Sequence, residues 1–214
     1  IGPSDQSYGI AGDANGSSYV TGAFKGTGTF GSTSLSNSGA FDAFVAKISD
    51  SGSWLWAKAA GSSSEDIGRS ITLDVDENVW VTGSFVGTVS FGSTSLVSNG
   101  SIDDIFVANL SATGSWQGAW KGGGSSSDIP YDITADSEGG LHVTGYLQGS
   151  ANFGTHSLTS NGGKDAFIAS MRSNGSWYAA VGGGGTSNVY AYGVEVDSHL
   201  TRYTVGKFQG TITF

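Results

Sequence analysis

The sequence contains no cysteine among its 214 residues. Disulfides, thiolate metal sites and a cysteine nucleophile are therefore excluded. The sequence also lacks an apolar run of about 18 residues, so we expect no membrane insertion. Its first residues show no basic segment followed by an apolar stretch, so we expect any targeting signal to have been removed or to lie outside this stretch.

Positive charge is scarce as well. Nine lysines and arginines stand against 18 aspartates and glutamates, which gives a formal net charge of −9. Nucleic-acid binding depends on clustered basic residues that neutralise phosphates, and binding to anionic membranes depends on them too. We therefore expect no nucleic-acid partner. The acidity favours a secreted or cell-surface location over others.

Helical periodicity is the third absence. Apolar residues instead alternate over short runs bounded by Gly, Ser, Asn and Asp, which is the pattern of strands. Hydrophobic residues make up 37% of the chain and aromatic residues 12%, enough to form a packed core. These observations predict an all-β fold.

A repeat of about 61 residues runs through the chain. It is marked by aspartates separated by 61, 62 and 61 residues, namely Asp13, Asp74, Asp136 and Asp197. Three further segments recur as DAFVAKIS, DIFVANLS and DAFIASMR, which begin at Asp42, Asp104 and Asp165. We divide the single domain 1–214 into repeats of approximately 1–61, 62–123, 124–184 and an incomplete 185–214, or about 3.5 copies.

Each repeat is predicted to hold four antiparallel strands. In the second repeat these are 69–75, 78–85, the segment that begins at Asp104, and 115–122. Asn, Asp and Gly in the links between the first two strands favour hairpin turns. The longer links 26–39, 87–100 and 149–162 carry a recurring Phe and Leu, which predicts an extra hairpin folded back on the repeat between strands two and three. Four-stranded meanders must stack to bury both faces, and radial stacking gives a β-propeller.

The run D-I-G-R-S-I-T-L-D-V-D-E-N-V-W-V-T-G (66–83), together with D-A-F-V-A-K and a closing A-A-G or G-G-G, resembles the bacterial β-propeller repeats called SBBP repeats. The resemblance covers essentially the whole chain. It implies a propeller in a secreted or surface-anchored microbial protein and supplies no catalytic residues. Because propellers close with four to eight blades, we expect this chain to be part of a longer one.

Residues that break the repeat are candidates for ligand contacts, because the scaffold does not require them. The links between strands four and one and between strands two and three should share one face, and they are the longer ones. On that face the candidates are Arg69, Tyr131, Phe41, Asp103 and Lys164. The alternative for these residues is ordinary surface variation.

Aspartates recur on the same face. Asp66 and Asp128 come from one set of links, and Asp42, Asp104 and Asp165 from the other. Carboxylates that converge could bind calcium. The alternative is that each aspartate accepts backbone N–H bonds and stabilises its loop. We expect no other cofactor.

No residue is predicted to be catalytic, and we expect no enzyme. His142 stands where the other repeats have Tyr19, Trp80 and Tyr203, so it should fill an aromatic packing position. The sequence favours a binding or adhesion module whose partner is a protein or glycan at a cell surface. Two alternatives remain open: a structural protein whose copies assemble into a coat or filament, and an enzyme domain that uses the loop face.

Overall fold

A computed structural model describes residues 5–213. Within that range every regular element is a β-strand, which confirms the all-β prediction. None of the described residues belongs to a helix of a length and apolarity that would cross a membrane.

The strands form three four-stranded antiparallel units followed by a pair. The first unit contains β1 (Gln6–Gly12), β2 (Ser18–Phe24), β5 (Asp42–Ile48) and β6 (Trp54–Ala60). The second contains β7 (Asp66–Leu73), β8 (Val79–Phe85), β11 (Asp104–Leu110) and β12 (Trp116–Gly124). The third contains β13 (Ile129–Ala135), β14 (Gly140–Phe153), β15 (His156–Arg172) and β16 (Trp177–Gly183). The fourth pairs β17 (Val189–Val196) with β18 (Arg202–Phe208). Each unit matches one predicted repeat.

The first strand of the second unit starts earlier than predicted. In the second unit we placed it at 69–75, whereas β7 runs from Asp66 to Leu73. The cause is a β-bulge, because the pairing with β8 shifts between Gly68 and Ser70 and leaves Arg69 without a partner. An extra residue reverses the alternation of faces, so the period-two pattern becomes readable only after the bulge.

The extra hairpin is present in all three complete repeats. It is formed by β3 (Thr27–Phe30) with β4 (Thr33–Ser36), by β9 (Thr88–Phe91) with β10 (Thr94–Val97), and by the adjoining ends of β14 and β15. In the second repeat the ring of Phe91 lies 5.1 Å from that of Trp116 on β12, at an interplanar angle of 78°. The hairpin is therefore folded back on its own unit, as predicted, and the contact between Phe and Trp holds it there.

The hairpin also joins neighbouring units, which the sequence did not reveal. Its first arm pairs with the end of the fourth strand of the preceding unit, through Gly61 with Ser90, Gly123 with Asn152 and Gly184 with Thr213. These contacts recur with the period of the repeat. They join the second and third units into one eight-stranded sheet and link the first and fourth units to their neighbours through isolated bridges.

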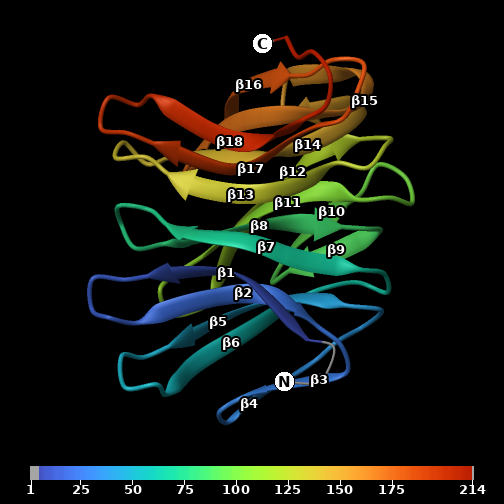
Figure 1. Cartoon of the computed structure of the whole chain (residues 1–214). Helices are drawn as coiled ribbons and strands as arrows, with labels where there is room; N and C mark the ends of the chain where they lie inside the picture. Colours follow the sequence, from blue (N-terminus) through green and yellow to red (C-terminus); the bar gives the residue numbers. More distant parts are fainter. Residues whose placement is uncertain (1–4, 214) are drawn as a thin grey trace.

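The core lies between the units. All seven residues of β8 and all seven of β11 are buried. Val81 and Phe106 of the second unit pack with Tyr19 and Val45 of the first. In Figure 1 the units follow one another in a stack, and their first strands β1, β7, β13 and β17 lie in succession. Each unit thus packs against its neighbours.

Candidate functional site

One bulge residue occupies the same place in the first strand of every unit. Interrupted pairing leaves four residues without ladder partners, and we call them the bulge residues: Tyr8, Arg69, Tyr131 and Tyr192. A bulge changes the direction of its side chain, and bulges are common beside functional sites. Because the first strands are neighbours, the fold sets these four side chains in one row.

Four tyrosine rings gather at the third and fourth units. We call Tyr131, Tyr146, Tyr190 and Tyr192 the tyrosine cluster. The Tyr131 centroid lies 5.9 Å from Tyr146 and 5.2 Å from Tyr192. Tyr190 lies 5.5 Å from Tyr146 and stacks on Tyr192 at 5.9 Å with an interplanar angle of 8°. The cluster therefore combines one buried ring, Tyr146, with an exposed one, Tyr192.

Two cations border the tyrosine cluster. Nζ of Lys164 lies 4.1 Å from the centroid of Tyr146 and 5.7 Å from that of Tyr190, within cation–π range. Arg69 donates from Nε and Nη2 to Oγ of Ser84, and its charge acts on the Tyr131 hydroxyl. Burial raises the pKa of Tyr131, so its hydroxyl stays neutral at physiological pH. The surface thus offers aromatic faces, neutral hydroxyl groups and positive charge.

Three of the five predicted ligand-face residues belong to this surface, namely Arg69, Tyr131 and Lys164. Phe41 and Asp103 occupy the position of Lys164 in the first and second repeats. The Phe41 ring faces Nζ of Lys25 at 5.9 Å, and the carbonyl of Asp103 accepts from the amide of Asp128 at 3.0 Å. The structure therefore does not bring these two residues into the tyrosine cluster.

The five aspartates considered for calcium are all buried. Each accepts a backbone N–H at its loop: Asp42 from Ser38, Asp66 from Ser62, Asp104 from Asn99, Asp128 from Gly124 and Gln148, and Asp165 from Asn161. These bonds fit the structural interpretation. Among residues 5–213, no group of three or more His, Cys, Asp or Glu gathers at metal-binding range.

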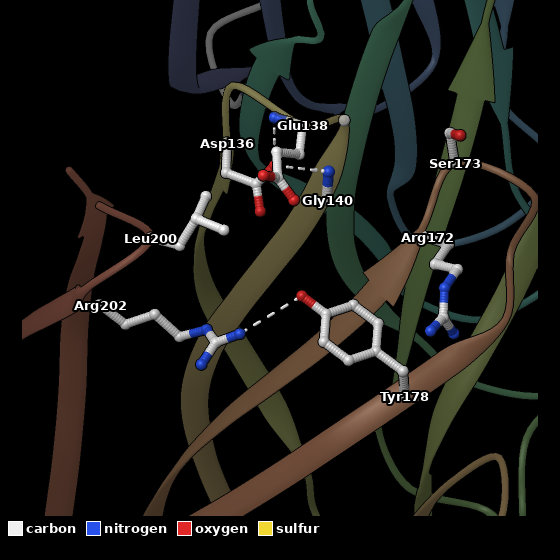
Figure 2. A pocket seen from close by; sticks show the side chains of 9 residues that line it. Asp136, Glu138, Gly140, Arg172, Ser173, Tyr178, Leu200 and Arg202 are labelled. Carbon is white, nitrogen blue, oxygen red and sulfur yellow. Dashed lines mark hydrogen bonds between the residues drawn. The ribbon is translucent and has the colours of Figure 1, made fainter. Parts of the chain in front are cut away.

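A pocket of about 410 Å³ lies at the other end of the strands. Figure 2 shows Arg202 and Tyr178 pointing toward each other, and Nη2 of Arg202 donates to the Tyr178 hydroxyl at 3.3 Å. Cζ of Arg172 lies 4.9 Å from the centre of the same ring. Sequence reasoning missed this pocket because it searched the opposite face. The signal available was the placement of two of the nine basic residues beside short turns.

His142 fills the aromatic position that was predicted and is 1% exposed. Its Nε2 lies 2.8 Å from Oδ2 of Asp136, and its Nδ1 lies 2.9 Å both from Oγ of Ser170 and from Nε of Arg202. Because Arg202 can only donate, Nδ1 accepts and Nε2 carries the proton donated to Asp136. Burial lowers the pKa of His142.

This Ser-His-Asp arrangement follows the repeat. In the other units Tyr19, Trp80 and Tyr203 likewise donate to the aspartate six residues earlier, for example Nε1 of Trp80 to Oδ2 of Asp74 at 2.8 Å. Ser170 is only 2% exposed, and Arg202 occupies the lone pair that a general base would use. The geometry thus accounts for His142 as part of the scaffold.

Comparison of the chain with protein-family models finds no match, and comparison with the curated proteins finds none either. The resemblance to SBBP repeats therefore stays a prediction from the sequence.

Proposed function

We propose that the chain is a non-catalytic β-propeller repeat module of a secreted or cell-surface microbial protein, and that it binds a protein or glycan. The ligand contacts the bulge residues and the tyrosine cluster. The single observation that carries this proposal is the row of Tyr8, Arg69, Tyr131 and Tyr192, one from each repeat.

The arrangement of the units supports propeller blades. In a propeller the first strand of each four-stranded blade lies next to the first strands of its neighbours. The strands β1, β7, β13 and β17 follow one another in this way, and two of the three core clusters span neighbouring units. Further blades would extend the row of bulge residues into a ring.

The chemistry of the surface supports binding. Tyr and Arg are enriched among residues that dominate the energy of interfaces, because they combine large apolar area with hydrogen-bonding groups. Tyr192 is 48% exposed and Tyr8 is 47% exposed. Both are bulge residues that lie outside the pairing of the strands. Flat aromatic faces bordered by cations suit the apolar faces and hydroxyl groups of a sugar, or an aromatic anchor of a protein.

A glycan array and an array of cell-surface proteins, both probed with the labelled chain, test this proposal. We expect at least one ligand, and we expect Tyr192→Ala to weaken its binding. Tyr178→Ala is the matched control, because Tyr178 lies at the other end of the strands beside Arg172. The proposal fails if no ligand binds, or if both variants bind as the parent chain does.

One observation favours self-assembly as a second candidate function. All seven residues of β18 are exposed, whereas all seven of the equivalent strand β8 are buried. Val205 and Phe208 are 68% and 58% exposed. An open apolar edge can pair with another chain. Sedimentation over a wide concentration range checks this: growing assemblies support a coat or filament protein, and a monomer at all concentrations argues against it.

A further inference from the structure

Two pairs of aspartates lie at the boundaries between units. Asp42 begins β5 of the first unit and Asp66 begins β7 of the second, and the amide of Asp66 donates to the carbonyl of Phe41 at 2.8 Å. Asp104 and Asp128 repeat this arrangement between the second and third units. Each pair therefore joins the third strand of one unit to the first strand of the next.

The four carboxyl groups are buried, and the charge of Lys121 acts on Asp104 without forming an ion pair with it. Asp42 is 2% exposed, and the other three are fully buried. None of the four forms an ion pair with a basic residue among those the structure describes. Two negative charges in such a place are unfavourable unless a cation accompanies them.

Three of the eight carboxyl oxygens also lack a hydrogen-bond partner. They are Oδ1 of Asp42, Oδ1 of Asp66 and Oδ1 of Asp104. In each of these residues Oδ2 is held by a backbone amide, at 2.9, 2.6 and 2.6 Å. Buried oxygens without partners are rare in folded proteins and call for a ligand. In each of these three residues the unpartnered Oδ1 therefore belongs to a carboxyl group that the hydrogen bond at Oδ2 holds in place.

A glycine lies directly against each pair. A Cβ atom on Gly123 would overlap Oδ1 of Asp104 and would lie 3.2 Å from Oδ2 of Asp128, so both carboxyl groups reach the same point. Gly123 has a φ of 131°, a conformation that favours glycine. A Cβ atom on Gly61 would likewise overlap the carboxyl group of Asp42. At the second boundary both carboxyl groups therefore approach Gly123, and at the first boundary the carboxyl group of Asp42 lies against Gly61.

We propose that each pair binds one Ca²⁺ ion, so that the chain binds two, and that the ions join neighbouring units. Calcium takes six to eight oxygen ligands, and backbone carbonyls and water complete a set that begins with two carboxylates. The boundary between the third and fourth units can be compared with these two. There Asp165 keeps an unpartnered Oδ1, but the residue equivalent to Asp66 and Asp128 is Val189. Because only one carboxylate lies at this boundary, we expect no third ion there.

Isothermal titration of the calcium-free chain with CaCl₂ tests the stoichiometry. We expect two ions per chain for the parent protein, and one each for Asp66→Asn and Asp128→Asn. Asp76→Asn is the control, because Asp76 is an exposed carboxylate in a turn and should leave two ions bound. Unchanged binding in both pair variants overturns the proposal, because the ions would then lie elsewhere.

Thermal unfolding of the parent chain gives a second readout that does not depend on variants. We expect its Tm to rise in CaCl₂ relative to EDTA, and to rise less in MgCl₂, because magnesium requires a more regular octahedral site. Equal Tm values in CaCl₂ and EDTA at neutral pH, with no heat of binding, overturn the proposal and indicate a proton shared within each pair. Neither experiment depends on the ligand of the tyrosine cluster.

Discussion

The rings of Tyr131 and Tyr192 meet at 5.2 Å with an interplanar angle of 60°, and the two residues are one repeat apart in the sequence. Each is the unpaired residue of a bulge in the first strand of its unit. The bulge recurs in all four units, whereas its side chain changes to arginine at position 69. The repeat therefore supplies a constant backbone position at which the side chain is free to serve a ligand.

Thr82→Val tests the hydrogen bond that ties the second strand to the third. Oγ1 of Thr82 donates to the carbonyl of Phe106 at 2.9 Å, and Thr21 and Thr144 make the same bond in their units. Valine keeps the shape and removes the donor, so we expect the free energy of unfolding to fall by about 1 kcal/mol. Urea unfolding measures the change.

The fourth unit offers the control for that variant. Thr204 is exposed on β18 and donates to the carbonyl of Gly193 within its own pair of strands. We expect Thr204→Val to change stability by less than about 0.5 kcal/mol. A loss at Thr204 equal to that at Thr82 would show that the buried bond contributes no more than an exposed one.

His142 tests whether the aromatic position needs a hydrogen-bond donor. His142→Ala removes the donor to Asp136 and leaves a cavity, so we expect a loss of about 3 kcal/mol. His142→Tyr should lose less than about 1.5 kcal/mol, because Tyr203 reaches Oδ2 of Asp197 at 3.0 Å from the same position. Urea unfolding of both variants measures the two losses in the free energy of unfolding. Equal losses would mean that the position requires histidine itself.

The scaffold was largely readable from the sequence. Alternation over short runs predicted the strands, and the recurring Phe and Leu of the longer links predicted the hairpin, which Phe91 fixes against Trp116. The donor at the aromatic position was also visible in principle, because an aspartate stands six residues before each of Tyr19, Trp80, His142 and Tyr203. Features that recur in every copy can be recognised from one chain.

The pairing between units, the position of the bulge and the tyrosine cluster could not be predicted, because the contacts that form them follow no pattern in the sequence. The pairing of Gly61 with Ser90 and of Gly123 with Asn152 joins units through residues with small or polar side chains, which show no alternation. The bulge at Arg69 reversed the alternation and moved the predicted strand start. The sequence placed Arg69, Tyr131 and Lys164 on one face together with Phe41 and Asp103, but nothing in it indicated which of these five residues would meet at the tyrosine cluster.

Asp128→Asn tests the buried carboxylates through pH. Because the folded-state pKa of Asp128 is raised to about 7, the folded chain holds this proton more tightly than the unfolded chain. The resulting stability is complete at pH values below the ordinary aspartate pKa, and it is lost as the pH rises through about 7. In EDTA the parent chain should therefore lose more stability than Asp128→Asn between about pH 5 and pH 8.

Thermal unfolding across that pH range measures the difference. His142, whose lowered pKa acts in the opposite direction, is present in both proteins and cancels in the comparison. In saturating CaCl₂ the order should reverse, so that the parent chain is the more stable at neutral pH. Parallel pH profiles in EDTA would contradict the account of a desolvated carboxylate.

The affinity of a ligand found on the arrays tests the central claim most directly. Isothermal titration should show that the double variant Tyr131→Ala/Tyr192→Ala binds that ligand at least about 30-fold more weakly than the parent chain, the effect of losing an interface hot spot. Tyr178→Ala, with its ring at the opposite end of the strands, should bind as the parent does. Equal affinities for the double variant and the parent would contradict binding through the bulge residues and the tyrosine cluster.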